Sequence, residues 1–305
     1  MDTMKEKYLK PQFETSDKGL LARAPAKVNL SLLIADKRPD GYHNLETLMA
    51  KITLYDEMLF ETDKEEGIEL VCNGLWSPAG EDNLVYKTCR LFYDAVNTEP
   101  RIKLTLTKNI PAGSGLGGAS SDAATVLLAL NKLYNQSIDS SKLHKLAGQL
   151  GSDVAFFLNG PLAVCTGRGE KVSKVDKKLP FAAVLVLSDI NTSTKRVYGN
   201  FKEDLELFSS LSGQIKAHIS KNRVDLVQKM CANMLAKTSF ALDNELALLK
   251  KEIQEITKLP VLLSGSGSAL FMILNAGQYR EAEILQREIA NSRGCNSIIV
   301  FDNEW

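Results

Sequence analysis

The chain has 305 residues and equal numbers of basic and acidic side chains, 37 of each, so its formal net charge is zero. This balance argues against a protein that bulk charge holds to nucleic acid. Its five cysteines are scattered, and no apolar stretch approaches the ~20 residues of a membrane span, so the sequence indicates no disulfide framework, zinc ribbon or membrane helix. We expect a cytoplasmic protein with neither nucleic-acid nor membrane partners.

Residues 1–18 are polar and mix acidic with basic side chains, unlike a signal or transit peptide, and we expect a disordered or loosely docked extension. The folded part begins with a strand predicted over residues 19–34. From Lys27 onward polar and apolar residues alternate, so Lys27 and Asn29 share one face. Such a face is most often solvated, and the strand alone favours that interpretation. Two further strands are predicted within residues 45–62.

Two pairs of predicted strands are placed to form hairpins. Residues 27–34 would pair with residues 49–55, and residues 68–71 with residues 102–107. A helix is predicted over residues 84–96. Because hairpin pairing dominates, we expect an α+β fold rather than a doubly wound parallel sheet.

A glycine-rich stretch joins the strand at residues 102–107 to a helix whose apolar stripe begins at Ala123. Glycine lets the backbone approach a ligand, and the unpaired N–H groups of a first helical turn favour an anion, most often a phosphate. A tight turn with a helix cap is the plainer alternative, but a run of this length that opens onto two serines favours phosphate binding. The stretch consists of Pro111, Ala112, Gly113, Ser114, Gly115, Leu116, Gly117, Gly118, Ala119, Ser120 and Ser121.

Two familiar phosphate loops do not match this stretch. A Walker A loop needs a lysine after its last glycine, and Ala119 stands there. A Rossmann loop lies early in a βαβ unit and follows a buried apolar strand, whereas residues 102–107 alternate. A third kind of phosphate loop is therefore needed.

Asp153 lies between a short helix predicted over residues 139–150 and the hydrophobic run 154–158. One interpretation is a helix N-cap. The other is a partly buried carboxylate that positions or deprotonates a hydroxyl. On local grounds both interpretations stay open.

The second half of the chain follows a lysine-rich segment at residues 171–178, which we expect to be an exposed hairpin turn or linker. A buried strand over residues 181–187 would begin a second domain, and an amphipathic helix is predicted over residues 208–235. The expected division is an N-terminal extension at residues 1–18, a first domain at 19–178 and a second domain at 179–305.

Three segments together resemble the motifs of the galactokinase, homoserine kinase, mevalonate kinase and phosphomevalonate kinase (GHMP) superfamily. They are Pro25–Leu30, Pro111–Ser121 and Ser264–Ala269. The string Asp40–His43 resembles a motif of the branch that phosphorylates 4-diphosphocytidyl-2-C-methyl-D-erythritol. The sister kinases do not share this motif at the corresponding position. The resemblance covers about residues 20 to 275.

This resemblance implies a two-lobed fold, with an N-terminal lobe like ribosomal protein S5 domain 2 and a C-terminal ferredoxin-like α/β sandwich lobe. It implies ATP-dependent phosphorylation of the substrate's 2-hydroxyl in the non-mevalonate route to isoprenoid precursors. Residues 111–121 would bind the ATP phosphates, and Mg²⁺ would arrive with the nucleotide, its protein ligands not identified. A monomer or weak homodimer is expected.

The resemblance also assigns roles to single residues. Asp153 matches the catalytic aspartate of the family, which orients or deprotonates the accepting hydroxyl. Lys27 matches its catalytic lysine, a positive charge that favours the ionised carboxylate and stabilises the transferring phosphate. The residues that match its substrate-binding positions are Asn29, Tyr42, His43 and Tyr198.

Two positions depart from the family pattern: Ala155 stands where proline is usual, and Gly199 where a basic residue is common. Two alternatives accompany the assignment, a homoserine or mevalonate kinase and a catalytically silent nucleotide-binding relative. Tyr42 and His43 argue against the first, because those substrates contain no pyrimidine. The retained pair of Lys27 and Asp153 argues against the second.

Overall fold

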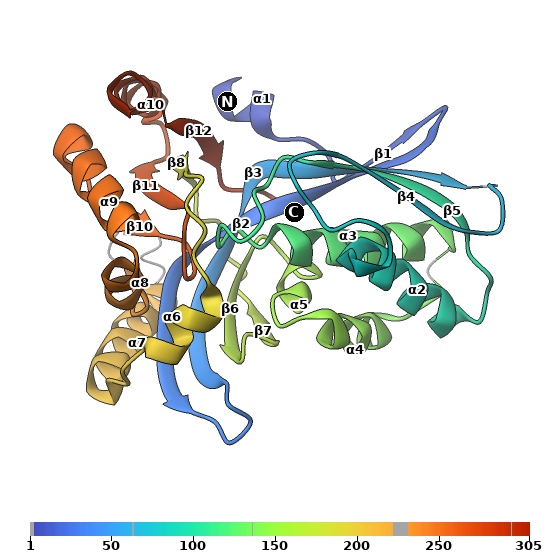
Figure 1. The fold of residues 1–305 in the computed structure, drawn as a ribbon, viewed down its shortest axis with the longest axis horizontal. Coiled ribbons are helices and arrows are strands. Elements are labelled where there is room, and N and C mark those ends of the chain that lie inside the picture. The colour runs from blue at the N-terminus through green and yellow to red at the C-terminus, as the bar shows by residue number, and fades with distance from the viewer. Residues whose placement is uncertain (1–2, 63, 136, 222–230, 294) are drawn as a thin grey trace.

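The computed structural model describes residues 3–62, 64–135, 137–221, 231–293 and 295–305, and within them two β-sheets form the framework (Figure 1). The strands are β1 (Phe13–Ser16), β2 (Gly19–Lys37), β3 (His43–Thr62), β4 (Gly67–Gly74), β5 (Arg101–Lys108), β6 (Leu162–Gly167), β7 (Lys171–Lys174), β8 (Phe181–Leu187), β9 (Ala232–Asn233), β10 (Leu262–Leu263), β11 (Leu270–Asn275) and β12 (Asn296–Phe301). The helices are α1 (Thr3–Tyr8), η1 (Gly80–Asp82), α2 (Leu84–Val96), α3 (Gly118–Leu133), α4 (Ser140–Leu150), α5 (Val154–Phe157), α6 (Thr194–Asn200), α7 (Leu205–Ser220), α8 (Ala236–Leu242), α9 (Asn244–Thr257) and α10 (Tyr279–Arg293).

The larger sheet has the order β1-β2-β3-β5-β4, with β6 and β7 attached beside β3 and β9 beside β2. The smaller sheet has the order β10-β11-β8-β12. Helices α2 to α5 share a hydrophobic cluster with the larger sheet, and α9 and α10 share another with the smaller one. This arrangement confirms the predicted α+β class.

Strands β2 and β3 form the predicted first hairpin, but they are much longer than a typical strand. They run antiparallel, with Lys27 opposite Lys51 and Ile34 opposite Leu45, and three register shifts interrupt the ladder. The two strands expected within residues 45–62 are one continuous strand. Bulges let so long a pair bend, so β2 can reach both lobes.

The polar face of β2 is buried, and the prediction of a solvated face was wrong. Lys27 is 4% exposed and Asn29 6%. The physical reason is that α3 and α7 both pack on β2 and the smaller sheet shares a core with it. Polar side chains on this face must therefore find partners within the protein.

Strands β4 and β5 pair in parallel, and the predicted second hairpin was wrong. The 13 residues of α2 lie between them and carry the chain back across the sheet. A crossover helix of this length permits parallel pairing, which a short turn cannot. The predicted helix itself is confirmed, and the side chain of Asn83 caps it by accepting the Val85 N–H.

Two predictions on the second half of the chain needed correction. The exposed segment 171–178 begins with β7, which pairs with β6 as the second arm of a hairpin. Of the helix predicted over residues 208–235, α7 ends at Ser220, and residues 222–230 lie outside the described part. Beyond them β9 pairs in parallel with β2, because tertiary contact outweighs helical periodicity there.

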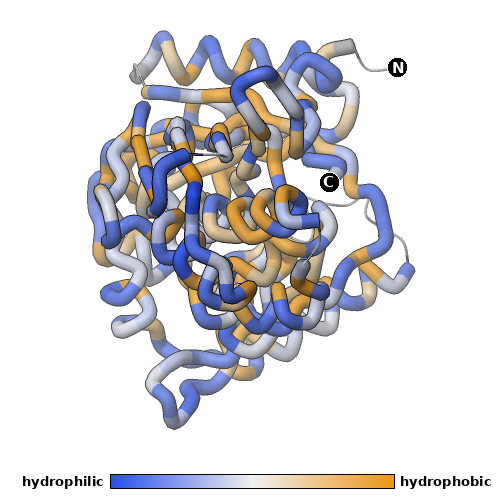
Figure 2. The backbone as a smooth tube through the Cα atoms, turned by 90° about the vertical axis from the view of Figure 1, so that its right-hand side faces the viewer, coloured by the Kyte–Doolittle hydropathy of each residue, from blue (hydrophilic) through white to orange (hydrophobic). Residues whose placement is uncertain are grey.

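The two sheets share one hydrophobic cluster. It contains Val28 and Leu30 from β2 together with Phe181 and Leu185 from β8 and Phe271 from β11. In Figure 2 the hydrophobic, orange stretches gather in the interior and the hydrophilic, blue ones lie toward the rim. A core that continues between the sheets holds the two lobes in a defined orientation.

The N-terminal extension is docked, so the expectation of a disordered or loosely docked tail was wrong for residues 3–18. Strand β1 pairs with β2. Helix α1 lies against β12, where Lys5 Nζ is 2.8 Å from the Asp302 carboxylate and the Tyr8 ring is 5.0 Å from Phe301. Its apolar residues thereby join the core of the smaller sheet.

None of the helices within the described residues has both the length and the apolar character that a membrane span requires.

Lys51 is a buried ammonium that joins β3 to the segment after α5. Its Nζ donates to the carbonyl oxygens of Phe157 at 3.1 Å and Asn159 at 2.6 Å, and it lies 5.9 Å from the Trp305 ring centroid. Burial lowers the pKa of Lys51 from 10.5 to about 7. The folded chain therefore releases a proton that the unfolded chain keeps until a much higher pH.

This difference predicts a pH-dependent stability. Between about pH 7 and about pH 10 the unfolded state binds more protons, so the free energy of unfolding rises with pH. Relative to Lys51→Met, the unmodified chain should gain roughly 2 kcal/mol or more across this range, as measured by urea unfolding at both ends. The exposed Lys87→Met serves as the control and should track the unmodified chain. An equal pH response in Lys51→Met and the unmodified chain would contradict the prediction.

Candidate active site

One cavity of about 1140 Å³ brings together residues from every motif singled out in the sequence. Of the predicted catalytic and substrate-binding residues, all six line it: Lys27, Asn29, Tyr42, His43, Asp153 and Tyr198. Of the glycine-rich stretch, nine residues line it: Pro111, Ala112, Gly113, Ser114, Gly115, Gly117, Gly118, Ala119 and Ser120. Leu116 and Ser121 do not line it, and both are fully buried.

The glycine-rich loop leads directly into the N-terminus of α3. Gly113, Gly115 and Gly117 have φ values of 71°, 79° and 72°. Residues with a side chain rarely adopt this left-handed backbone conformation. Gly117 is the N-cap, and no side chain caps the helix. The first N–H groups of this 16-residue helix are thus left for a ligand, and the helix dipole favours an anion there.

The loop is fixed to the third motif by backbone contacts. Ser264 Oγ donates to the Gly115 carbonyl at 2.9 Å, and the Ala269 N–H donates to the Ser114 carbonyl at 3.0 Å. A Cβ added to Gly115 would lie 2.1 Å from the Ser264 carbonyl oxygen. The loop and residues 264–269 therefore form one rigid unit, and only glycine fits at their junction.

Lys27 lies where the motifs meet. Its Nζ donates to Asn29 Oδ1 at 2.5 Å and to the Gly115 carbonyl at 2.8 Å, and it is 3.9 Å from Asp153 Oδ2. Its own backbone N–H donates to the Leu116 carbonyl at 2.9 Å. Burial lowers the pKa of Lys27, and the charge of Asp153 opposes that shift. The structure thus holds an ammonium and a carboxylate side by side beneath the glycine loop.

Asp153 occupies the N-cap position of α5, as one interpretation predicted, but its side chain makes no capping hydrogen bond and is left for another role. Its hydrogen-bond partner is the Ser152 hydroxyl, which donates at 3.4 Å, and about a third of the side chain is exposed to the cavity. Ala155, at the position of the usual proline, is buried within α5. With alanine instead of proline at position 155, the Asp153 carboxylate still faces the cavity.

Aromatic side chains also line the cavity, namely Tyr42, His43 and Tyr198. The His43 ring is buried and lies 5.9 Å from Tyr198 and 6.0 Å, edge-on, from Phe201. Tyr42 is 59% exposed, and the Arg168 guanidinium lies 5.1 Å from its ring centroid. Burial raises the pKa of the Tyr198 phenol, which keeps it a neutral hydrogen-bond donor. Such a cluster suits a planar heterocycle.

Several lining residues were not singled out by sequence reasoning. The connection between β4 and α2 supplies Trp76, Ser77 and Pro78, and the end of β5 supplies Lys108. Phe201 was also missed, because nothing in its local sequence separates it from a core aromatic. For this side of the cavity, the sequence signal that could have identified the site is the stretch that ends at Asn83, the residue that caps α2.

The cavity offers few side-chain ligands for a Mg²⁺ ion. Among the described residues, no group of three or more His, Cys, Asp or Glu side chains could hold a metal ion by itself. Mg²⁺ is commonly bound by one or two carboxylates together with substrate phosphates and water. The Asp153 carboxylate faces the cavity beside the loop, so the donor set fits a Mg²⁺ that arrives with a nucleotide.

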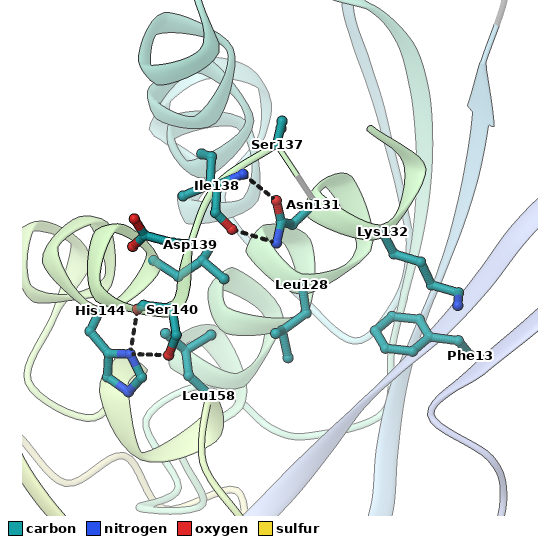
Figure 3. Close-up of a pocket in the computed structure, with 11 residues that line it drawn as sticks. Phe13, Leu128, Asn131, Lys132, Ser137, Ile138, Asp139, Ser140, His144 and Leu158 are labelled. Carbon is teal, nitrogen blue, oxygen red and sulfur yellow. Dashed lines mark hydrogen bonds between the residues drawn. The ribbon is translucent and has the colours of Figure 1, made fainter. Parts of the chain in front are cut away.

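A second cavity, of about 800 Å³, lies between the α3–α4 connection and β1 (Figure 3). Asn131 exchanges hydrogen bonds of 2.9 and 3.0 Å with the backbone of Ile138, and His144 Nδ1 lies 2.8 Å from the Ser140 carbonyl. The bonds of Asn131 hold α3 to the connection that leads into α4, and the contact of His144 lies within the first turn of α4. None of the predicted site residues lines this cavity, and we assign the candidate site to the larger one.

Comparison with known proteins gives a consistent family. Residues 83–161 match the family model of the GHMP kinases N terminal domain. The chain is 34% identical over 280 residues to a 4-diphosphocytidyl-2-C-methyl-D-erythritol kinase of Geobacillus sp. (strain WCH70), covering 92% of this chain and 95% of that relative. It is 35% identical over 255 residues to the enzyme of that name from Bacillus subtilis (strain 168), covering 83% and 87%.

Solved structures agree. A crystal structure of 4-(cytidine 5'-diphospho)-2C-methyl-D-erythritol kinase matches with a TM-score of 0.73 at 32% identity, covering 93% of this chain and 99% of that one. Homoserine kinase from Cytophaga hutchinsonii matches with the same TM-score at 17% identity, covering 97% and 98%. The latter likeness shows the fold alone. Together they confirm the predicted GHMP-kinase-like fold.

The junction of loop and third motif predicts unequal costs for two glycine substitutions. Gly113→Ala and Gly115→Ala share the left-handed strain of about 1 kcal/mol. Only Gly115→Ala also drives a Cβ into the Ser264 carbonyl, whereas the nearest atom to a Cβ on Gly113 is 3.5 Å away. Gly115→Ala should cost a further ~1–3 kcal/mol in unfolding free energy, measured by thermal and urea unfolding. Equal losses in the two variants would refute the junction.

Proposed function

We propose that this chain, which belongs to the 4-diphosphocytidyl-2-C-methyl-D-erythritol kinase family, transfers the γ-phosphoryl group of ATP to the 2-hydroxyl of 4-diphosphocytidyl-2-C-methyl-D-erythritol. This reaction serves isoprenoid precursor synthesis by the non-mevalonate route. One observation carries the proposal: a single cavity is lined by the glycine loop, by an aromatic cluster and by Lys27 and Asp153, whose charged groups lie 3.9 Å apart.

The glycine loop binds the ATP phosphates in this proposal. Its backbone has the positive φ values that let N–H groups converge, and the uncapped N-terminus of α3 opens onto it. Positioning and charge stabilisation are most of what phosphoryl transfer needs from a protein. Mg²⁺, when bound with the nucleotide, would neutralise charge on the phosphates.

Lys27 and Asp153 act on the accepting hydroxyl. The hydroxyl oxygen attacks the γ-phosphorus, the bond to the bridging oxygen breaks, and ADP leaves. Asp153 orients the hydroxyl or takes its proton, since its carboxylate is open to the cavity. The Lys27 ammonium, fixed by the Gly115 carbonyl, favours the ionised carboxylate and stabilises charge on the moving phosphoryl group.

The aromatic cluster reads the cytosine. Tyr42 and Tyr198 supply ring faces, and His43 a hydrogen-bonding edge. Asn29 is proposed to contact the substrate beside Lys27, although its amide already accepts from Lys27 Nζ and donates to Thr47 at 2.8 Å. These bonds give Asn29 a second role, which is to hold the ammonium in place.

We also propose the coarser features that accompany this activity. The chain would work in the cytoplasm as a monomer or weak homodimer. The division into an extension at 1–18, a nucleotide-binding domain at 19–178 and a second domain at 179–305 is retained, because its boundary falls between β7 of the larger sheet and β8 of the smaller one.

The test is ADP release from purified protein with Mg²⁺ and ATP, followed by a coupled assay. ADP should appear with 4-diphosphocytidyl-2-C-methyl-D-erythritol and not with homoserine or mevalonate, since neither carries a pyrimidine for the aromatic cluster. Asp153→Asn should lower kcat by about a hundredfold or more while ATP affinity, measured by calorimetry, changes little.

Two results would contradict this function. Turnover of homoserine or mevalonate at a comparable rate would remove the pyrimidine requirement. ATP binding without turnover of any of the three would indicate a silent nucleotide-binding relative, and would direct attention to Ala155 and Gly199.

A further inference from the structure

Three buried charged side chains from three elements meet beneath the glycine loop. Lys108 Nζ, at the end of β5, donates to Asp56 Oδ2 on β3 and to Asp122 Oδ2 on α3, the latter at 2.7 Å. All three side chains are at most 5% exposed. The cluster therefore contains two carboxylates and one ammonium with almost no access to water, and Lys108 and Asp122 line the candidate active site.

The two carboxylates are not equally supported. Asp56 Oδ1 accepts the backbone N–H groups of Asn109 at 2.6 Å and Ile110 at 2.8 Å, in addition to the bond from Lys108 to Oδ2. Asp122 accepts from Lys108 alone, and its Oδ1 is buried with no hydrogen-bond partner. If both carboxylates were ionised beside one buried ammonium, one negative charge would be uncompensated away from water, at a large cost in free energy. The better-supported Asp56 keeps the charge, and the proton falls to Asp122.

We infer that Asp122 is a protonated, uncharged carboxylic acid at the working pH, and that it acts as a positioning residue for the ATP phosphates. The inference rests on the proposed ATP site. Protonation removes one of the two negative charges that face the Lys108 ammonium. The cluster of Asp56, Lys108 and Asp122 then has no net charge.

The surroundings of Asp122 support this protonation state. Burial and the charge of Asp56 raise the pKa of Asp122 to about 8, against the opposing charge of Lys108. Asp56 on β3 and Lys108 on β5 are the charged groups that act on it within the described part of the chain.

The position of Asp122 explains why its charge matters. It follows Gly118 by four residues, so the two lie on the same face of α3, one turn apart. Lys108 Nζ lies 3.3 Å from where a Cβ on Gly118 would stand, directly beside the first helical turn. An ionised Asp122 would place a negative charge one turn below the N–H groups that hold the phosphates, and it would partly cancel the positive potential that the helix N-terminus offers them.

The experiment compares the KM for ATP and kcat of the unmodified chain and Asp122→Asn between about pH 6.5 and about pH 9.5. Asparagine has the shape of the protonated acid and cannot ionise. In the unmodified chain the KM for ATP should rise by roughly tenfold above about pH 8, as Asp122 ionises. In Asp122→Asn that rise should be absent. The exposed Asp94→Asn on α2 is the matched control and should behave like the unmodified chain.

A KM that stays flat with pH in the unmodified chain, or that rises in parallel in Asp122→Asn, overturns the inference. The pH dependence of kcat distinguishes ionisation of Asp122 from ionisation of Lys27. Ionisation of Asp122 should change the KM for ATP, while the fall of kcat at alkaline pH should be the same in the unmodified chain and in Asp122→Asn.

A second readout needs no turnover. Infrared difference spectra between the unmodified chain and Asp122→Asn should show the C=O stretch of a protonated carboxyl at about pH 7, which disappears above about pH 9. Should Asp122→Asn fail to fold, the same band can be followed by pH difference in the unmodified chain and should vanish in Asp56→Asn, where Asp122 becomes the sole carboxylate of Lys108. Absence of the band at about pH 7 overturns the inference even if the proposed substrate is wrong.

Discussion

The site depends on one desolvated ammonium. Lys27 comes from β2, its carbonyl partner Gly115 from the glycine loop 88 residues away, and its carboxylate neighbour Asp153 from the start of α5. A buried charge is costly unless it is paired and hydrogen-bonded. The three segments must therefore arrive together for any of them to be stable there. The same requirement that holds the fold in this region assembles the catalytic pair, the phosphate loop and the strand that carries Asn29.

The cavity lies where the two sheets share a core. The glycine loop is held from one side by α3 and from the other by residues 264–269, through Ser264 and Gly115. The aromatic side chains are carried by the β2–β3 turn and by α6 of the second lobe. Nucleotide and acceptor would thus approach the same carboxylate within one cavity. A rigid junction favours this reaction, because positioning is most of what phosphoryl transfer requires.

Local signals predicted much of this structure. Alternation predicted β2, capping residues predicted α2 and α4, and the glycine run predicted the loop, because each depends on nearby residues. Other features depend on contacts distant in sequence. The parallel pairing of β4 with β5, the docking of residues 3–18 and the burial of the β2 polar face could not be read from local patterns. The cluster of Asp56, Lys108 and Asp122 was missed for the same reason, since each member alone looks like an ordinary surface charge.

The most direct measurement of the central claim is ³¹P NMR of a reaction that contains the protein, Mg²⁺, ATP and 4-diphosphocytidyl-2-C-methyl-D-erythritol. The account predicts that the γ-phosphate resonance of ATP is lost as one new phosphomonoester resonance appears, with the diphosphate signals of the acceptor retained. That result would place the phosphoryl group on a hydroxyl of the substrate. Release of inorganic phosphate alone, or no change in the ATP resonances, would contradict the account.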